Sequence, residues 1–138
     1  MVIVIDCNIL VMCLTSRSPY HLVFQSLVKR KFDLAVTEEI LLEYEEIIQL
    51  KYGVRTSGSF ISLLRELPNV HYANTYFKWN LIAADPEDNK YVDCAIASRA
   101  AFIVTEDRHF SVLASIQFPS VSVLSLDGFM NLLEEGNR

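Results

Sequence analysis

The chain has 138 residues, of which 51% are hydrophobic and 21% charged, a composition that excludes a disordered chain and fits one compact domain. Its formal charge of −5 gives no general affinity for polyanions such as nucleic acid, although bound metal ions would offset the carboxylates that hold them. The three cysteines form no Cys-x-x-Cys pair, which argues against a disulfide framework or a zinc site and favours a reducing, cytoplasmic setting.

The first predicted element is a buried strand at Val2–Ile5, a short β-branched run that ends on Asp6. Because Asp6 interrupts this run and no basic region precedes it, no signal peptide is expected, and no apolar stretch is long enough to span a membrane. A helix is predicted next, since Ser18 is a favourable N-cap, Pro19 suits the first helical position, and apolar residues recur at helical spacing up to Lys31.

The sequence pattern in the middle of the chain predicts two further strands and two helices. Leu34–Val36 is typical of a strand, and Thr37 then caps a helix that Gly53 ends. A second helix follows Thr56–Ser59 and runs to the next proline, and Val70–Tyr72 forms an edge strand.

The last third of the chain continues this alternation after residues 73–84, for which strand, helix and loop all stay open. The predicted elements are a helix from the turn at 85–88 to about Ala100, a strand at Phe102–Val104, a short helix at Arg108–Ile116, a strand at Val121–Leu124 and a helix from its cap Asp127 through Leu133. The alternation predicts an α/β domain with a mainly parallel central sheet, and residues 1–138 form a single domain.

Four acidic side chains are notable for their places in these elements. Asp6 directly follows the first strand and Asp107 follows the strand that ends at Val104, so both lie at the strand ends where open α/β sheets bind ligands. Glu43 lies beside the apolar stripe of its helix, and Asp93 is embedded in the apolar run YVDCAIA, where a carboxylate costs free energy unless it is paired or coordinated. Carboxylates that meet in one pocket repel one another, and Mg²⁺ or Mn²⁺ would relieve that repulsion.

Each candidate also has a plainer interpretation that the sequence leaves open. These plainer roles are caps or turns for Asp6, Asn8, Asp88 and Asp107, a solvated helix position for Glu43, ion pairing with Arg99 or Lys90 for Asp93, and a surface position for His109.

Three segments, VIVIDCNIL, VTEEILLEYEEII and DPEDNKYVDCAIASRAAFIVTEDRHF, resemble a PIN domain of the group of toxin components similar to VapC-type toxins. The resemblance covers nearly the whole chain, and its short motifs occur in order with the expected spacing. It implies a three-layer α/β/α fold with a mainly parallel central sheet of about five strands. The family's four acids correspond, motif by motif, to Asp6, Glu43, Asp93 and Asp107, with Asn8, Thr105 and Asp88 beside them.

The resemblance implies a metal-dependent endoribonuclease that hydrolyses RNA phosphodiester bonds with Mg²⁺ or Mn²⁺ as cofactor. The implied roles are catalysis and metal binding for Asp6, Glu43, Asp93 and Asp107, a share of the third acid's work for Asp88, and control of carboxylate geometry or contact with the phosphate for Asn8 and Thr105.

Partners are implied in the same way: an RNA substrate, a small antitoxin protein that silences the toxin, and a second copy of the chain in a homodimer. Because the net charge is unfavourable, local positive charges are expected to attract RNA, and the candidates that flank the acids are Lys90, Arg99 and Arg108. The aromatic residues Tyr76, Phe77 and Trp79 serve either a dimer or antitoxin groove or the core.

Rival functions fit the sequence less well. A phosphoaspartate receiver domain needs an acidic pair after its first strand and a lysine after its last, and the sequence has neither. A haloacid-dehalogenase-type phosphatase needs an acid where Asn8 stands, and an amide cannot transfer a proton. The closer alternative is a catalytically weak PIN domain that acts as an RNA- or protein-binding module.

Overall fold

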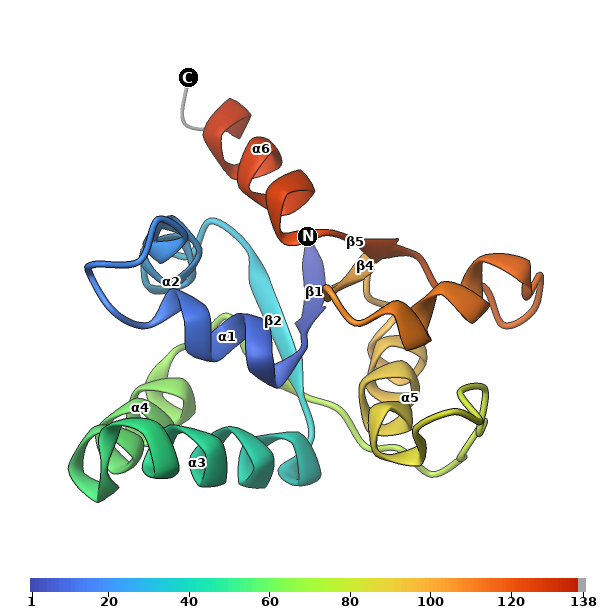
Figure 1. Ribbon diagram of the computed structural model, residues 1–138, viewed down its shortest axis with the longest axis horizontal. Coiled ribbons are helices and arrows are strands. Elements are labelled where there is room, and N and C mark those ends of the chain that lie inside the picture. Colours follow the sequence, from blue (N-terminus) through green and yellow to red (C-terminus); the bar gives the residue numbers. More distant parts are fainter. Residues whose placement is uncertain (137–138) are drawn as a thin grey trace.

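A computed structural model describes residues 1–136 and shows an α/β fold with helices on both faces of a five-stranded sheet (Figure 1). The strands are β1 (Val2–Ile5), β2 (Asp33–Val36), β3 (Val70–Tyr72), β4 (Phe102–Val104) and β5 (Val123–Leu124). The helices are α1 (Cys7–Cys13), α2 (His21–Val28), α3 (Glu38–Tyr52), α4 (Val54–Glu66), α5 (Asn89–Ser98) and α6 (Leu126–Gly136), with 3-10 helices η1 (Pro86–Asp88) and η2 (Arg108–Ser115). The predicted fold class is confirmed.

The order of the strands creates a crevice at one edge of the sheet. All four strand pairs are parallel, and the order is β3-β2-β1-β4-β5, so the chain builds outward from β1 in one direction and then returns to β1's other side. The point where the direction reverses lies between β1 and β4, and such a switch point opens a crevice beyond the carboxyl ends of the strands. Asp6 extends β1 there, with its backbone N–H donating to the Val104 carbonyl at 3.1 Å.

Helix α1 is an element that the sequence analysis missed. It begins directly after Asp6, and most of its residues are buried, with Asn8 and Met12 as the exposed exceptions. A short helix that is apolar almost all round shows no amphipathic period, so its sequence resembles a continuation of the strand.

Four predicted boundaries were wrong. The helix expected after Thr56–Ser59 begins earlier, as α4 at Val54, directly after Gly53. Helix α2 begins at His21, since the Ser18 hydroxyl accepts from the Tyr20 N–H in a turn of its own (3.1 Å) instead of capping the helix. The last strand, β5, is only two residues long. The cap of α6 is Ser125, whose hydroxyl accepts from the Gly128 N–H at 3.0 Å, and Asp127 lies in the first turn.

The helical hairpin α3–α4 matches the prediction more closely. The Thr37 hydroxyl caps α3 by accepting from the Ile40 N–H at 3.1 Å. Gly53 both ends α3 and precedes α4 at φ 95°, a conformation that L side chains rarely adopt. The Tyr44 hydroxyl of α3 donates to the Ile5 carbonyl, which ties this hairpin to the end of β1 where Asp6 begins.

The edge strand β3 and strand β4 occupy the predicted positions. Cys7, Cys13 and Cys94 are buried as free thiols, as small apolar residues would be. Within residues 1–136, none of the helices combines the length and the apolar character that crossing a membrane requires.

Candidate active site

Asp6 belongs to an acidic cluster at the switch point between β1 and β4. Its side chain is almost fully buried and accepts two hydrogen bonds, from the Asn8 N–H at 3.2 Å and from the Thr105 hydroxyl at 2.7 Å. Burial raises the pKa of Asp6, and the nearby carboxylates of Glu43 and Asp107 raise it further against the effect of these two bonds. The sequence therefore places an ionisable group where its charge is costly unless a cation is present.

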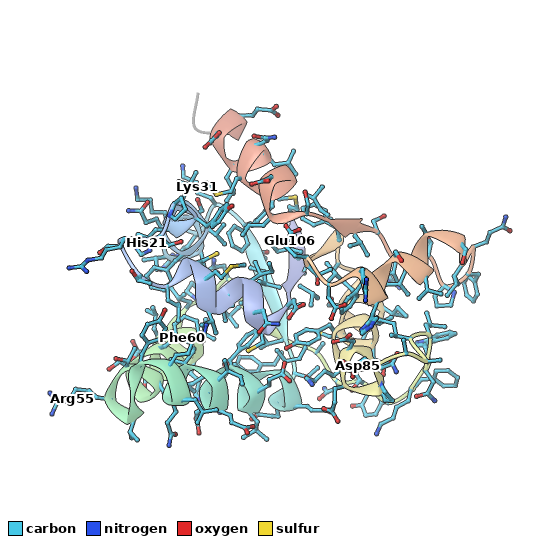
Figure 2. All side chains as sticks on the ribbon, viewed as in Figure 1. His21, Lys31, Arg55, Phe60, Asp85 and Glu106 are labelled. Atoms are coloured by element: carbon cyan, nitrogen blue, oxygen red, sulfur yellow. The ribbon has the colours of Figure 1, made fainter. Side chains whose placement is uncertain are left out.

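Asp107 reaches the same cluster from the end of β4. The Thr105 hydroxyl accepts from the Asp107 N–H at 3.0 Å while donating to Asp6, so one threonine holds both acidic residues in place. The Asp107 carboxylate also accepts from the His109 N–H at 2.8 Å at the start of η2. Its sequence neighbour Glu106 lies apart and accepts from the Leu126 N–H (Figure 2).

Asp88 completes the cluster from the N-terminal end of α5. Ligand atoms of Asp85, Asp88, Asp107 and His109 all lie within 4.8 Å of one another (Figure 2 labels Asp85). Burial and the carboxylates of Asp107, Asp85 and Asp6 raise the pKa of Asp88 to about 6. These groups come from the segment before α5 and from the segment after β4, which the fold brings together at the switch point.

The donor set fits a divalent cation. The His109 Nδ1 lies 3.3 Å from Asp107 Oδ1 and 3.6 Å from Asp88 Oδ2, and Nδ1 and Asp88 Oδ2 are buried atoms without a hydrogen-bond partner among residues 1–136. Atoms that share one ion at about 2.1 Å are separated by such distances. Carboxylate oxygens with one imidazole nitrogen suit Mg²⁺ or Mn²⁺, and the nitrogen favours Mn²⁺.

Glu43 lies near Asp6 but already has a cation. The Lys90 ammonium is 2.9 Å from its Oε2, and the Tyr91 hydroxyl donates to its Oε1. Burial opposes the charge on Lys90, yet the contacts with Glu43 and Glu87 outweigh burial and raise the pKa of Lys90. Because the Lys90 side chain is only 5% exposed, it does not serve as the RNA-attracting charge that the sequence suggested.

Asp93 lies apart from the cluster. Its carboxylate accepts from the Trp79 N–H at 3.1 Å, and the charged groups that act on it are Lys78 and Glu39, with Asp6 and Asp107 not among them in the described part of the chain. Five residues separate Asp93 from Asp88, which corresponds to about 140° around a helix. The side chains of Asp93 and of the N-cap Asp88 therefore point in different directions. Among residues 1–136, Asp93 forms an ion pair with neither Arg99 nor Lys90.

The remaining candidates differ in exposure and place. Asn8 is exposed at the start of α1, next to Asp6. Arg108 is exposed beside Asp107, whereas Arg99 caps the C-terminal end of α5, the end far from Asp88. Of the three expected positive charges, Arg108 alone is both exposed and next to an acidic residue of the cluster.

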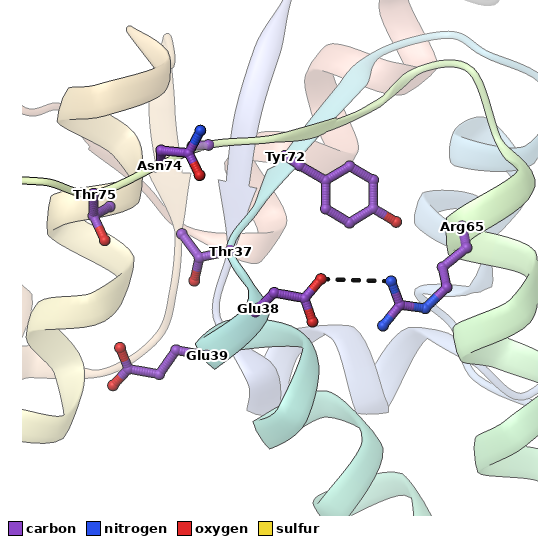
Figure 3. A pocket seen from close by; sticks show the side chains of 8 residues that line it. Thr37, Glu38, Glu39, Arg65, Tyr72, Asn74 and Thr75 are labelled. Carbon is purple, nitrogen blue, oxygen red and sulfur yellow. Dashed lines mark hydrogen bonds and ion pairs between the residues drawn. The ribbon is translucent and has the colours of Figure 1, made fainter.

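One open pocket of the surface does not contain the acidic cluster. This pocket of about 550 Å³ lies at the carboxyl ends of β2 and β3, where Arg65 and Glu38 form an ion pair at 3.5 Å across it (Figure 3). Both side chains of this pair are more than half exposed, so it contributes little to stability. The pocket adjoins the N-terminal end of α3 and holds no member of the acidic cluster.

Comparisons with known proteins agree with this architecture. A family model described as a PIN domain matches residues 2–109. Among solved structures, the chain is similar to one described as the crystal structure of VapBC2 from Rickettsia felis bound to a DNA fragment from their promoter, with a TM-score of 0.63, 16% identity, and coverage of 91% of this chain and 98% of that chain. A search of curated proteins found no match. At this identity, the structural similarity shows the fold alone.

Proposed function

The chain belongs to the PIN domain family of nucleases, and from this membership we propose that it is a single-domain, metal-dependent endoribonuclease that hydrolyses RNA phosphodiester bonds. The observation that carries the proposal is the cluster of Asp6, Asp88 and Asp107 at the switch point of the sheet, with two buried polar atoms left without partners among the described residues. An isolated group of carboxylates would destabilise the fold at neutral pH, so a cation is the expected occupant.

Asp85, Asp88 and Asp107 would hold the ion, with His109 as a nitrogen ligand. Asp6, whose charge acts on Asp88, would bind the ion directly or through water. A bound Mg²⁺ or Mn²⁺ supplies a Lewis acid that neutralises the charge developing on the phosphoryl oxygens. The proposal thus gives the third acidic position to Asp88, which was expected only to share it, and gives Asp93 the role of anchoring the backbone at Trp79.

The other residues of the site act by positioning. Thr105 holds the carboxylates of Asp6 and Asp107, which keeps both oriented before substrate arrives. Glu43, held by Lys90 and Tyr91, would accept a hydrogen bond from the attacking water. Asn8, exposed beside Asp6, would donate its amide N–H to a phosphate oxygen.

We also propose that the chain is the toxin component of a toxin–antitoxin pair, cytoplasmic and homodimeric, with a small antitoxin as partner. The similarity to the VapC-type fold supports this assignment. A positively charged antitoxin side chain in the cluster would compensate the same carboxylates that a metal compensates.

One observation favours the second candidate, a binding module with weak catalysis. The Lys90 ammonium lies on Glu43 and neutralises one of the acidic residues that the family uses. In this alternative, the domain binds RNA or a partner protein without efficient cleavage.

Incubation of the protein with labelled RNA separates the two candidates. The nuclease proposal predicts cleavage with Mn²⁺, no cleavage with chelator, and loss of cleavage in Asp6→Asn, while Asp127→Asn, an exposed change on α6, behaves as wild type. Cleavage that survives both the chelator and Asp6→Asn contradicts the mechanism. Binding without cleavage under every metal condition favours the binding module.

A further inference from the structure

An exposed aromatic surface lies on two loops at one end of the molecule. It consists of Tyr76, Phe77 and Trp79, from the segment before α5, and Phe118, from the segment after η2; we call it the aromatic patch. Tyr76, Phe77 and Phe118 are 92%, 63% and 84% exposed. The Phe77 and Trp79 ring centroids are 4.6 Å apart, and those of Trp79 and Phe118 are 6.2 Å apart. Exposed apolar side chains that gather in this way indicate an interaction surface.

The segment that carries Trp79 is hydrogen-bonded to α5, the helix whose N-cap residue is Asp88. Asp93 of α5 accepts from the Trp79 N–H, and the Asn89 side chain makes two bonds to the backbone of Ile82, both at 2.9 Å. The segment without regular structure at residues 73–84 is therefore anchored at two points. A preorganised platform loses less conformational entropy when a ligand binds than a free loop does.

The patch also lies within reach of a strand bound at the acidic cluster. Both loops of the patch border the cluster along the chain: residues 73–84 lead directly to Asp85, and the segment of Phe118 follows η2, which begins beside Asp107. The Asn89 side chain also fixes the backbone of Ile82 next to Asp88. A phosphate at the cluster would leave the bases of its neighbours at the patch.

We propose that the aromatic patch stacks unpaired bases of single-stranded RNA that flank the phosphate bound at the acidic cluster, an inference that rests on the proposed ribonuclease function. Phe77 and Phe118 contact Trp79 at tilted angles of 59° and 84°, yet their side chains stay 63% and 84% exposed, so most of each ring surface is open to a planar ligand. Exposed Lys78 stands between two of the rings in sequence and offers a cation for the backbone phosphate. The continuity of both loops with the acidic cluster, through Asp85 and His109, favours RNA over a second copy of the same chain as the occupant.

The experiment uses Trp79, the only tryptophan of the chain, as its own reporter. An unlabelled oligoadenylate of about 12 nucleotides is titrated in the presence of chelator, so that binding is measured without cleavage. Quenching of Trp79 fluorescence is expected, and Phe77→Ala or Phe118→Ala is expected to weaken binding about tenfold, because each variant removes one ring on which a base can stack. Phe118→Tyr, which keeps the ring, should restore binding, and Leu50→Ala, a change at another exposed apolar side chain, should leave binding unaltered.

The outcomes separate this inference from the proposed function. If Mn²⁺-dependent cleavage is observed but Phe77→Ala and Phe118→Ala bind and cleave as wild type, the inference is wrong and the function stands. If the two variants instead lose self-association in sedimentation and keep RNA binding, the patch is a dimer surface and the inference is again wrong. If the wild type neither binds nor cleaves RNA, both proposals fail.

Discussion

Asp88→Asn tests whether the cluster is electrostatically strained without a cation. Asp88 lies among the carboxylates of Asp107, Asp85 and Asp6, and its pKa rises from 3.8 to about 6. A shift of about 2 units corresponds to about 3 kcal/mol. Because the folded state binds the proton more tightly, this stability is present below about pH 4 and is lost as the pH rises through about 6. Asparagine removes the charge, and Asp88 makes no side-chain cap bond to α5 that would be lost.

The assay is thermal or urea unfolding with chelator at several pH values between about 4 and 7.5. The variant is expected to be more stable than the wild type near pH 7, by up to about 3 kcal/mol or roughly 10 °C in Tm, and the difference should vanish toward pH 4. Asp127→Asn is the matched control, because it changes the same chemical group at an exposed site on α6.

Saturating Mn²⁺ should reduce the difference in the free energy of unfolding between Asp88→Asn and the wild type. A ligand at a hundred times its Kd stabilises the native state by about 2.7 kcal/mol, and the wild type should gain more of this than Asp88→Asn. The reasoning is refuted if the variant is no more stable than the wild type near pH 7 with chelator, or if Asp127→Asn gives the same increase.

Three further substitutions probe the residues that position the site. Lys90→Met leaves the Glu43 carboxylate uncompensated and should cost about 2 kcal/mol in urea unfolding; partial recovery in Lys90→Met/Glu43→Gln is expected, and no recovery would contradict the pairing. Thr105→Val removes the bond to Asp6 and should weaken Mn²⁺ binding about tenfold in calorimetry; unchanged affinity would argue against this role. His109→Ala should weaken Mn²⁺ binding more than Mg²⁺ binding, and equal losses would exclude a nitrogen ligand.

The sequence was most informative where pattern and packing agree. The β-branched run at Val2–Ile5 and the Thr37 cap followed by Ile40 predict their elements correctly because burial and local hydrogen bonding favour the same conformation. Helix α1 was not predicted, because its nearly uniform burial removes the amphipathic period. The start of α2 was predicted wrongly, because the Ser18 hydroxyl can cap either a helix or a turn and the tertiary structure decides which.

The candidate site was predictable in its location but not in its full membership. Asp6 and Asp107 follow parallel strands, and the topology of the sheet brings such positions together. The choice between Asp88 and Asp93 depends on where α5 begins, since a shift of a few residues rotates a side chain to another face. The signal that indicates Asp88 is its place just after Asp85 and Pro86, at the start of the helix.

Anomalous diffraction would locate a cation bound at the acidic cluster. Crystals grown with MnCl₂ and measured at the manganese absorption edge would show any ion as an anomalous peak. The proposed metal site predicts a peak in contact with the carboxylates of Asp6, Asp88 and Asp107, and the loss of this peak in crystals of Asp88→Asn. A peak at Asp93 instead, or no peak at the cluster under saturating Mn²⁺, would contradict it.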